Sequence, residues 1–458
     1  MSAVNFISYL STSQIKTLTT TSMQRLSSEQ VNALSTTQVA ALNSAQLTAI
    51  DTGDMNSLKV TSLTSTALQG LTTQQLAAIT AGVAAFEESQ ISGLSSGIIS
   101  SLTTDQLDAL ASSDKLDALS TKQIEFLTAA NLSSTAIADL TTGQVAKLSS
   151  AQVTALVSDA VAALTSEQLG ALATSAIAGL ETEDMAIFNA SSAKLQALST
   201  KQIAALETAD LLALDSTGAG FLTSAQIGAL TTDQISVLTS DEMEGWNSAQ
   251  VNALTSKQIQ VLTVSGLSTT QQGFLTSGQI SGLNSTQLGQ ISTDAFSGWT
   301  TDQLQGLTAG AIAGMTTQQA VLLDANDLNA LASKTLAAIS DANIALIGTE
   351  AIALLDTDSI KALTTAQIAA LTTEQVTALT STQISALSLA QISAFEDGDI
   401  ALFTSAEIGA ISTAAINGLS EADIMSLSDE LLDGLTSEQV PAMKGDLHNW
   451  VIAAYATT

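Results

Sequence analysis

The residue types that most often carry out chemistry are scarce in this chain of 458 residues. It contains no cysteine, so thiol catalysis and disulfide bonds are excluded, and its one histidine is His448. One histidine is too few for a metal site built from several imidazoles. A serine–histidine–aspartate triad needs only one, but the sequence around His448 does not indicate a pocket. We therefore interpret His448 as part of a surface tail.

Pairs of adjacent carboxylates are the second candidates for chemistry, because two acids can act as general acid and general base. They occur at Glu87–Glu88, Asp241–Glu242 and Asp429–Glu430. Each pair lies where a helix is predicted to begin, and the helix dipole favours negative charge there. The sequence also lacks the phosphate-binding motif GxxxxGK[ST] and an aspartate-rich calcium loop. We expect no enzyme activity, no cofactor and no metal site.

The overall charge narrows the choice of partners. The net charge is −31, from 43 acidic and 12 basic residues, and this disfavours binding to nucleic acids or to anionic membrane surfaces. No apolar run approaches the length of a transmembrane helix, so we expect no membrane insertion. The start of the chain lacks the basic and apolar regions of a secretory signal. If the protein is exported, we expect export without an N-terminal signal peptide.

An eight-residue pattern returns along most of the chain, as in ALTTAQIAALTTEQVTALTSTQISAL between Ala362 and Leu387. The first position is leucine, the second and third are threonine or serine, and the fifth is glutamine. The sixth is isoleucine, valine or leucine, and the eighth is usually alanine. From Leu275 to Met443 this step of eight is unbroken. Aromatic residues make up only 3% of the chain, and the narrow alphabet indicates one repetitive body.

The pattern predicts one short helix in each repeat. A continuous helix turns by about 100° per residue, so the leucines would wind around it and leave no apolar stripe. Threonine at the second position and glutamine at the fifth form a capping box, and the first and sixth positions form a hydrophobic staple. We predict an all-α solenoid of very short capped helices, with the first, sixth and eighth positions inside. A β-solenoid is the alternative, because an even period keeps each position on one strand face.

The repeat also organises the chain into three parts. Residues 1–9 form an apolar N-terminal segment, residues 10–443 a continuous solenoid, and residues 444–458 an apolar C-terminal tail. The register slips near 58–63, 79–86, 110–140, 188–198 and 262–275. We interpret the slips as insertions, because no linker or change of composition separates domains. Trp246 and Trp299 occupy leucine positions and are predicted to lie in the core.

Both ends of the chain are apolar, although solenoids usually end in polar capping repeats. A contact between unlike ends that does not close on itself generates a filament. The alternative is that each tail folds back over its own last repeat. The candidate assembly contacts are Val4, Phe6, Ile7, Tyr9, Trp450, Val451, Ile452 and Tyr455.

The repeat LTTEQVTAL resembles the LTxxQ signature of small helical periplasmic proteins of bacteria, where it occurs sparsely rather than in tandem. The whole chain is similar to secreted, acidic, cysteine-free repeat proteins of bacterial surfaces that are rich in serine, threonine and alanine. Several of these leave the cell by type I secretion with an uncleaved C-terminal signal, and the tail NWVIAAYATT is similar to such signals. The resemblance implies an extracellular or cell-surface location, as in a biofilm. The calcium-binding GGxGxD repeats common in that group are absent.

We therefore predict a structural extracellular repeat protein. Its partner is a further copy of itself, joined head to tail as a homopolymer in a filament, sheath or surface layer. The alternative is a monomeric cell-surface adhesin or binding scaffold, which uses the solenoid face to bind a partner such as cell-surface glycans.

Overall fold

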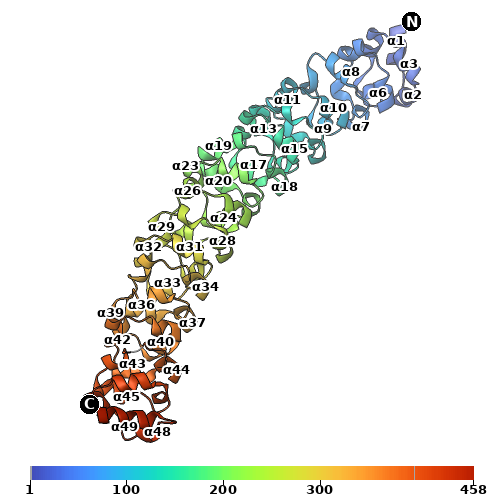
Figure 1. The fold of residues 1–458 in the computed structure, drawn as a ribbon. Helices are drawn as coiled ribbons and strands as arrows, with labels where there is room; N and C mark the ends of the chain where they lie inside the picture. Colours follow the sequence, from blue (N-terminus) through green and yellow to red (C-terminus); the bar gives the residue numbers. More distant parts are fainter. Residues whose placement is uncertain (1–2, 397, 458) are drawn as a thin grey trace. The chain divides into compact units, whose positions relative to one another are not determined.

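The computed structural model describes residues 3–396 and 398–457, and this part of the chain is helical and contains no strand. Short helices follow one another along the chain (Figure 1). In the unbroken register they include α40 (Thr357–Ala362), α41 (Thr365–Ala369), α42 (Thr373–Thr377), α43 (Ser381–Ala386) and α44 (Leu389–Ile392). The predicted all-α repeat solenoid is confirmed, and the β-solenoid alternative is wrong, because the described residues form many short helices and no strand.

Many repeats, including those of α41 to α44, begin with the predicted capping box. In α41 the Thr364 hydroxyl accepts the Gln367 N–H at 3.0 Å, and the Gln367 Oε1 accepts the Thr364 N–H at 2.9 Å. The preceding helix ends at Ala362, and its C-cap residue Leu363 has an extended backbone. The leucine therefore separates two helices and places the next cap.

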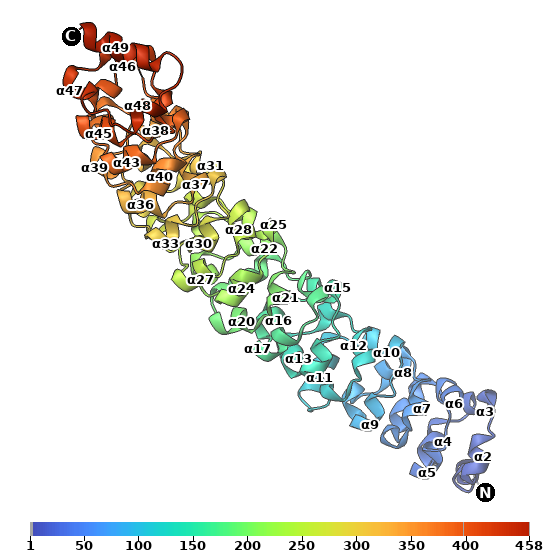
Figure 2. The same cartoon turned by 90° about the horizontal axis from the view of Figure 1, so that it is seen from below.

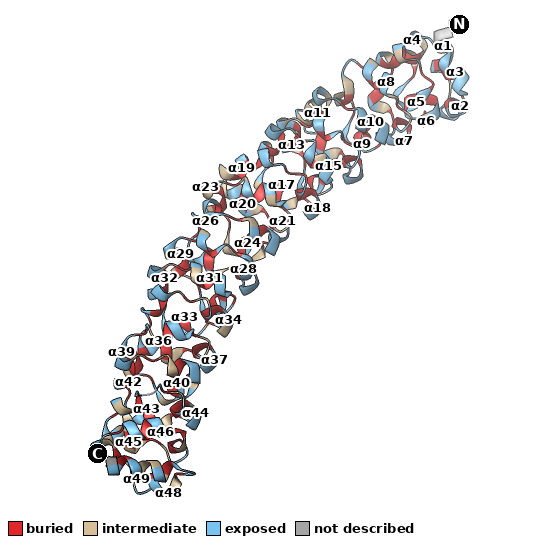
Figure 3. Cartoon of the chain, in the orientation of Figure 1, coloured by how far each residue is buried: buried red, intermediate tan, exposed pale blue. Residues whose placement is uncertain are grey.

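The core is formed by the first and sixth positions, as Leu363 and Ile368 illustrate. The eighth-position alanines, such as Ala362 and Ala370, are half-buried rather than fully inside as predicted. The fifth-position glutamine is also buried, which was not predicted: Gln367 is fully shielded from solvent. Figure 3 shows buried residues along the inner side of the helices and exposed residues outside.

The buried glutamines join successive turns of the solenoid. The Gln367 Nε2 donates to the carbonyl oxygens of Leu336 and Ile339 at 3.0 and 2.8 Å, at the end of a helix four repeats earlier. Gln391 donates in the same way to Ile360 and Leu363, at 2.9 Å each. Helices three repeats apart, such as α40 and α43, also pack together. One turn therefore holds between three and four repeats.

A second link runs from some exposed or half-buried asparagines toward the next turn. The Asn329 Nδ2 donates to the Leu354 carbonyl at 3.2 Å, and its Oδ1 accepts the Asp356 N–H at 3.0 Å. Each of these asparagines thus bonds both a carbonyl and an N–H group at the end of a later helix. The same pair of bonds is made by Asn56, Asn189 and Asn417.

The five-residue register slips are shortened repeats rather than insertions. Each contains a 3-10 turn in place of an α-helix: η2 (Val60–Ser62), η5 (Ala129–Asn131) and η7 (Val264–Gly266). Val60, Ala129 and Val264 fill the buried sixth position. The Gln279 Nε2 still reaches Val251 and Leu254, four repeats back, although fewer residues intervene. The stack is therefore continuous across such a slip.

Lysines replace the glutamine amide in three irregular repeats. The Lys59 Nζ donates to the Asn32 and Leu34 carbonyls at 2.7 Å each. Lys115 bonds Ala84 and Phe86 in the same way, and Lys194 bonds Ala162. An ammonium group has several donors and a long stem, so it reaches these helix ends from an altered register.

The remaining 3-10 helices lie at other places where the repeat register changes, or near repeats that carry an acid at the fifth position. They are η1 (Thr52–Ser57), η3 (Gly82–Ala85), η4 (Leu116–Ala118), η6 (Thr182–Asp184), η8 (Ile400–Leu402) and η9 (Ile416–Gly418).

Contacts divide the chain into two compact bodies, one ending at Leu230 and the other beginning at Thr231. Each body is a stack of the kind described above (Figures 1 and 2). The prediction of one continuous solenoid concerns how the two bodies join, and it stays a prediction. No helix in the described residues is long and apolar enough to cross a membrane.

Candidate assembly surfaces at the two ends

The first turn of the solenoid has no earlier turn to cover it. It consists of α1 (Ala3–Ser8), α2 (Thr12–Lys16), α3 (Thr20–Gln24) and α4 (Ser28–Ala33). Its leucines at the first position, Leu10, Leu18 and Leu26, are half-buried, whereas those that follow, beginning with Leu34 and Leu42, are buried. Apolar surface that later turns bury is therefore left open here.

The predicted contact residues of this end lie in different environments. Phe6 and Tyr9 are 63% and 76% exposed. Ile7 is buried, and its carbonyl accepts the Gln38 Nε2 at 3.0 Å, so its side chain belongs to the core. The backbone of Val4 lies in α1, but its side chain lies outside the described residues. A role of these residues in assembly stays a prediction.

Gln14 occupies the fifth position in this first turn. Its Oε1 accepts the Ser11 N–H at 2.9 Å, which completes the capping box. Its side chain is exposed, and its Nε2 donates to no atom of the described residues. The bond that a fifth-position glutamine makes to the previous turn is therefore missing at this end.

The other end is covered by α49 (Leu447–Thr457), which is longer than any other helix in the described part of the chain. It lies against α46 (Glu421–Ser426) and α47 (Asp429–Leu432), as Figures 1 and 2 show. Leu447 and Ala454 of this helix are buried. The tail is thus folded back over the last turn.

The predicted contact residues of α49 divide between its two faces. Trp450 and Val451 are half-buried, whereas Ile452 is 68% exposed and Tyr455 is also exposed. The Tyr455 hydroxyl donates to the Asp433 Oδ1 at 2.8 Å. Desolvation, then this bond and the charge of Asp433, raise the pKa of Tyr455 above its ordinary value. The outward face of α49 is apolar at Ile452.

The two ends also differ in charge. The charged side chains among residues 1–50 are Lys16, Arg25 and Glu29. Residues 421–446 carry seven acids against the single Lys444. One end is therefore weakly basic and the other strongly acidic.

Acids replace the fifth-position glutamine at several interior sites, and a carboxylate cannot donate to the previous turn. Asp210 is the most buried of them, and its Oδ2 has no hydrogen-bond partner among the described residues. Burial, followed by the nearby charge of Glu207 and then of Asp184 and Glu181, raises the pKa of Asp210 to about 6. Burial likewise raises the pKa of Asp184. At each such acid the hydrogen bond from a glutamine amide to the previous turn is therefore missing.

The paired carboxylates lie at helix starts, as predicted. Glu87 is the N-cap of α9 (Glu88–Ile91), Asp241 and Glu242 lie in the first turn of α26 (Ser240–Met243), and Asp429 and Glu430 begin α47. The described residues include no group of three or more histidine, aspartate or glutamate side chains placed to hold a metal ion.

The two predicted core tryptophans are buried. Trp299 donates its indole N–H to the Gln272 carbonyl at 3.1 Å, and Trp246 lies in the core without a partner for its own N–H among the described residues. His448 is half-buried in α49.

One sequence motif was not recognised among the candidate sites. Residues 93–97 read GLSSG, which fits the GxSxG pattern of serine hydrolases. In the structure Ser95 is the N-cap of α10 (Ser96–Ser101), and its hydroxyl accepts the Ile98 N–H. The Gly93 Cα packs against Ser65 of the previous turn. This motif is accounted for by the repeat.

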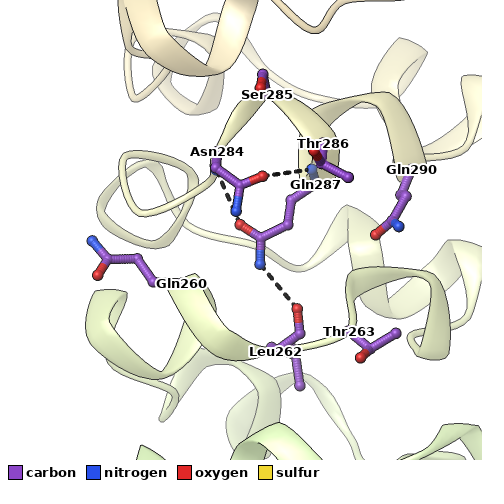
Figure 4. A pocket seen from close by; sticks show the side chains of 8 residues that line it. All are labelled: Gln260, Leu262, Thr263, Asn284, Ser285, Thr286, Gln287 and Gln290. Atoms are coloured by element: carbon purple, nitrogen blue, oxygen red, sulfur yellow. Dashed lines mark hydrogen bonds between the residues drawn. The ribbon is translucent and has the colours of Figure 1, made fainter.

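Hollows on the surface lie between repeats. One of them is lined by residues of 260–290, and among these Asn284, Gln287 and Leu262 take part in a cap and in a bond between turns (Figure 4). There the Gln287 Nε2 donates to the Leu262 carbonyl at 2.9 Å, and the Asn284 Oδ1 accepts the Gln287 N–H at 3.0 Å. A second groove, of about 700 Å³, includes the exposed side chains of Val321, Leu322 and Leu354.

Comparison with known families gives a match to the repeat itself. Residues 137–174, 203–240 and 352–389 each match the ALTTAQ repeat. Among the curated proteins compared, none matches the chain. The three matches and the regular capped helices together define a helical repeat protein.

Proposed function

We propose that this repeat protein is structural and joins end to end with further copies, the first turn of one against the last turn of the next. The observation that carries the proposal is the difference between the ends. The first turn is weakly basic and leaves apolar side chains open, whereas the last turn is acidic.

Charge favours a contact between unlike ends. Lys16 and Arg25 are exposed, and they would face the acids of residues 421–446 in a second copy. Two last turns brought together would place seven acids against seven, which costs free energy at low ionic strength. A head-to-tail contact that does not close into a ring produces a filament, which could bundle into a sheath or surface layer.

Exposed apolar side chains supply the short-range part of the contact. Phe6 and Tyr9 are aromatic, and burying such side chains contributes most of the free energy at many protein interfaces. The half-exposed Leu10, Leu18 and Leu26 add the apolar surface that an earlier turn would otherwise cover.

The place of action that we propose is outside a bacterial cell or on its surface, with export by a route that reads the C-terminal tail. This part rests on composition and on the resemblance of the tail to type I secretion signals. Tagged protein in the producing cell would test it: we expect the tag in the medium or on the surface, and its retention inside would contradict the location without affecting assembly.

A charge reversal tests the contact. We expect the variant Lys16→Glu with Arg25→Glu to prevent assembly of the full-length protein in low salt, as followed by analytical ultracentrifugation. Lys201→Glu changes an exposed lysine of the first body that lies far along the chain from the first turn, and it should leave assembly unchanged. Equal assembly of wild type and double variant would contradict the proposal.

The groove at residues 321–354 favours a second function, a binding scaffold. Val321, Leu322 and Leu354 are large apolar residues at the seventh and eighth positions, where most repeats carry small residues. A monomer that binds surface material through this groove should lose binding in Leu354→Asp, whereas a filament protein should still assemble with this change.

A further inference from the structure

The stacking of the solenoid leaves hydrogen-bonding groups unused at both ends. In the regular repeats a leucine carbonyl accepts from a glutamine 28 residues later, as Leu363 does from Gln391. Counting 28 residues from Leu419 leads to Leu447, and from Leu427 to Tyr455, neither of which carries an amide. Within the described residues the carbonyl oxygens of Leu419, Leu427 and Leu435 accept no hydrogen bond.

These three carbonyls, with the end of α46, form what we call the acceptor face. Helix α49 lies against α46 and brings buried Leu447 and Ala454 to this end instead of donors. The first turn of the chain holds the complementary group, because the Gln14 Nε2 is exposed and donates to no atom of the described residues.

We infer that the acceptor face beneath α49, rather than the outer face of α49, is the docking surface for the first turn of a second copy. This inference rests on the proposed function. The occupant is a second copy because its first turn carries the unused amide, the half-exposed leucines and the positive charge that this acidic end lacks. In the free protein α49 occupies the acceptor face, and docking displaces it.

The outer face of α49 offers a poorer surface. A contact there would bury Ile452 and Tyr455, but it would leave Gln14 and the carbonyls of the acceptor face without partners. Docking on the acceptor face instead lets the first turn of the second copy donate hydrogen bonds to the turn before it, as the turns inside the solenoid do. It replaces the buried contacts of Leu447 and Ala454 and the exposed bond from Tyr455 to Asp433.

Two aspartate substitutions in one helix test the inference. Ala454 is 1% exposed, so Ala454→Asp should loosen α49, whereas Ala453→Asp places the same charge at an exposed position. We expect Ala454→Asp to lower the protein concentration at which copies assemble by about tenfold, which corresponds to about 1.4 kcal/mol. Ala453→Asp should leave that concentration unchanged.

Hydrogen exchange is measured on the same samples. In Ala454→Asp we expect faster exchange in residues 447–457 and unchanged protection in residues 419–435. If those residues also lose protection, Tyr455→Phe replaces the variant, because it removes only the hydroxyl that bonds Asp433. A lowered assembly concentration is again the expected result.

The remaining outcomes separate the two proposals. If Ala454→Asp frees α49 but weakens assembly, or if Ala453→Asp abolishes it, the outer face of α49 is the docking surface and this inference is wrong, while head-to-tail assembly stands. If neither wild type nor variants assemble at any concentration, the proposed function is wrong and the inference with it.

Discussion

At the scale of the residue, the fifth-position glutamine side chain both caps its own helix and bonds the previous turn. The Oε1 of Gln367 completes the cap of its own helix, and its Nε2 bonds the end of a helix in the previous turn. Because this amide is buried, losing its donor would leave carbonyl groups without partners in a shielded place.

Gln367→Glu separates the capping interaction from the bond to the previous turn. The glutamate keeps the capping oxygen but cannot donate, so we expect a loss of about 2–4 kcal/mol in the free energy of unfolding. Gln14→Glu, at the exposed fifth position of the first turn, should cost less than about 0.5 kcal/mol. Chemical denaturation, with hydrogen exchange of residues 333–370, measures both. Equal effects of the two changes would show that the second bond contributes nothing.

Because of Asp210, we predict that the stability of the folded protein falls as the pH rises. Its pKa is raised from 3.8 to about 6 in the folded protein, so folding favours the protonated form. This contribution is fully present below about pH 4 and is lost as the pH rises through about 6. We expect about 1–2 kcal/mol, less than the shift alone implies, because nearby solvent screens the charge.

Thermal unfolding between pH 4 and 7 tests this prediction. Asp210→Asn should remove part of the pH dependence, because asparagine is neutral throughout and keeps a donor for the previous turn. Asp159→Asn, which changes an exposed acid in the same body, should not alter it. An unchanged pH profile in Asp210→Asn would refute the assignment.

The local part of this chemistry is predictable from sequence, and the part between turns is not. Threonine, glutamine and isoleucine at fixed spacing define the cap and the staple within one helix, so Thr364 and Gln367 could be assigned in advance. The bonds from Gln367 to Leu336 and Ile339 depend on how many repeats make a turn, which the spacing within one repeat does not contain. The burial of Gln367 and of Ile7 was missed for this reason.

At the scale of the element, close packing of successive turns depends on glycine. The Gly306 Cα faces the previous turn, and an added Cβ would lie 2.2 Å from the Ser277 carbonyl oxygen. The same close approach occurs at other eighth-position glycines, including Gly70, Gly179 and Gly314. The sequence shows a glycine at each of these positions, but not which backbone atom each one meets.

Gly306→Ala should therefore destabilise the second body by about 1–3 kcal/mol, because the two turns must separate. Gly273→Ala is the matched change, since nothing lies within 4 Å of its added Cβ, and helix propensity should make it neutral or slightly stabilising. Denaturation midpoints of the two variants provide the comparison. If both variants behave alike, the turns are not in close contact at Gly306.

The irregular elements show a second limit of prediction. The five-residue slips at Leu58–Leu63 and Leu262–Leu267 looked like insertions, because a 3-10 turn of three residues has no capping signature. Helix α49 carries no octad pattern either, so its fold over α46 could only be offered as an alternative.

At the scale of the whole molecule, contacts between repeats stabilise each body, and the two ends determine where a second copy binds. The interior repeats that carry a buried glutamine bond the previous turn, so each body stabilises itself repeat by repeat. The two ends differ from the interior turns in the exposure of Phe6, in the open amide of Gln14 and in the charge of residues 421–446. The account therefore expects contacts between copies at the ends rather than along the repeats.

Electron microscopy of the purified full-length protein across a dilution series in low salt tests this claim most directly. The account predicts copies joined in unbranched series that lengthen as the concentration rises and separate when salt is added, because the contact is partly electrostatic. Single copies at every concentration and salt would contradict it.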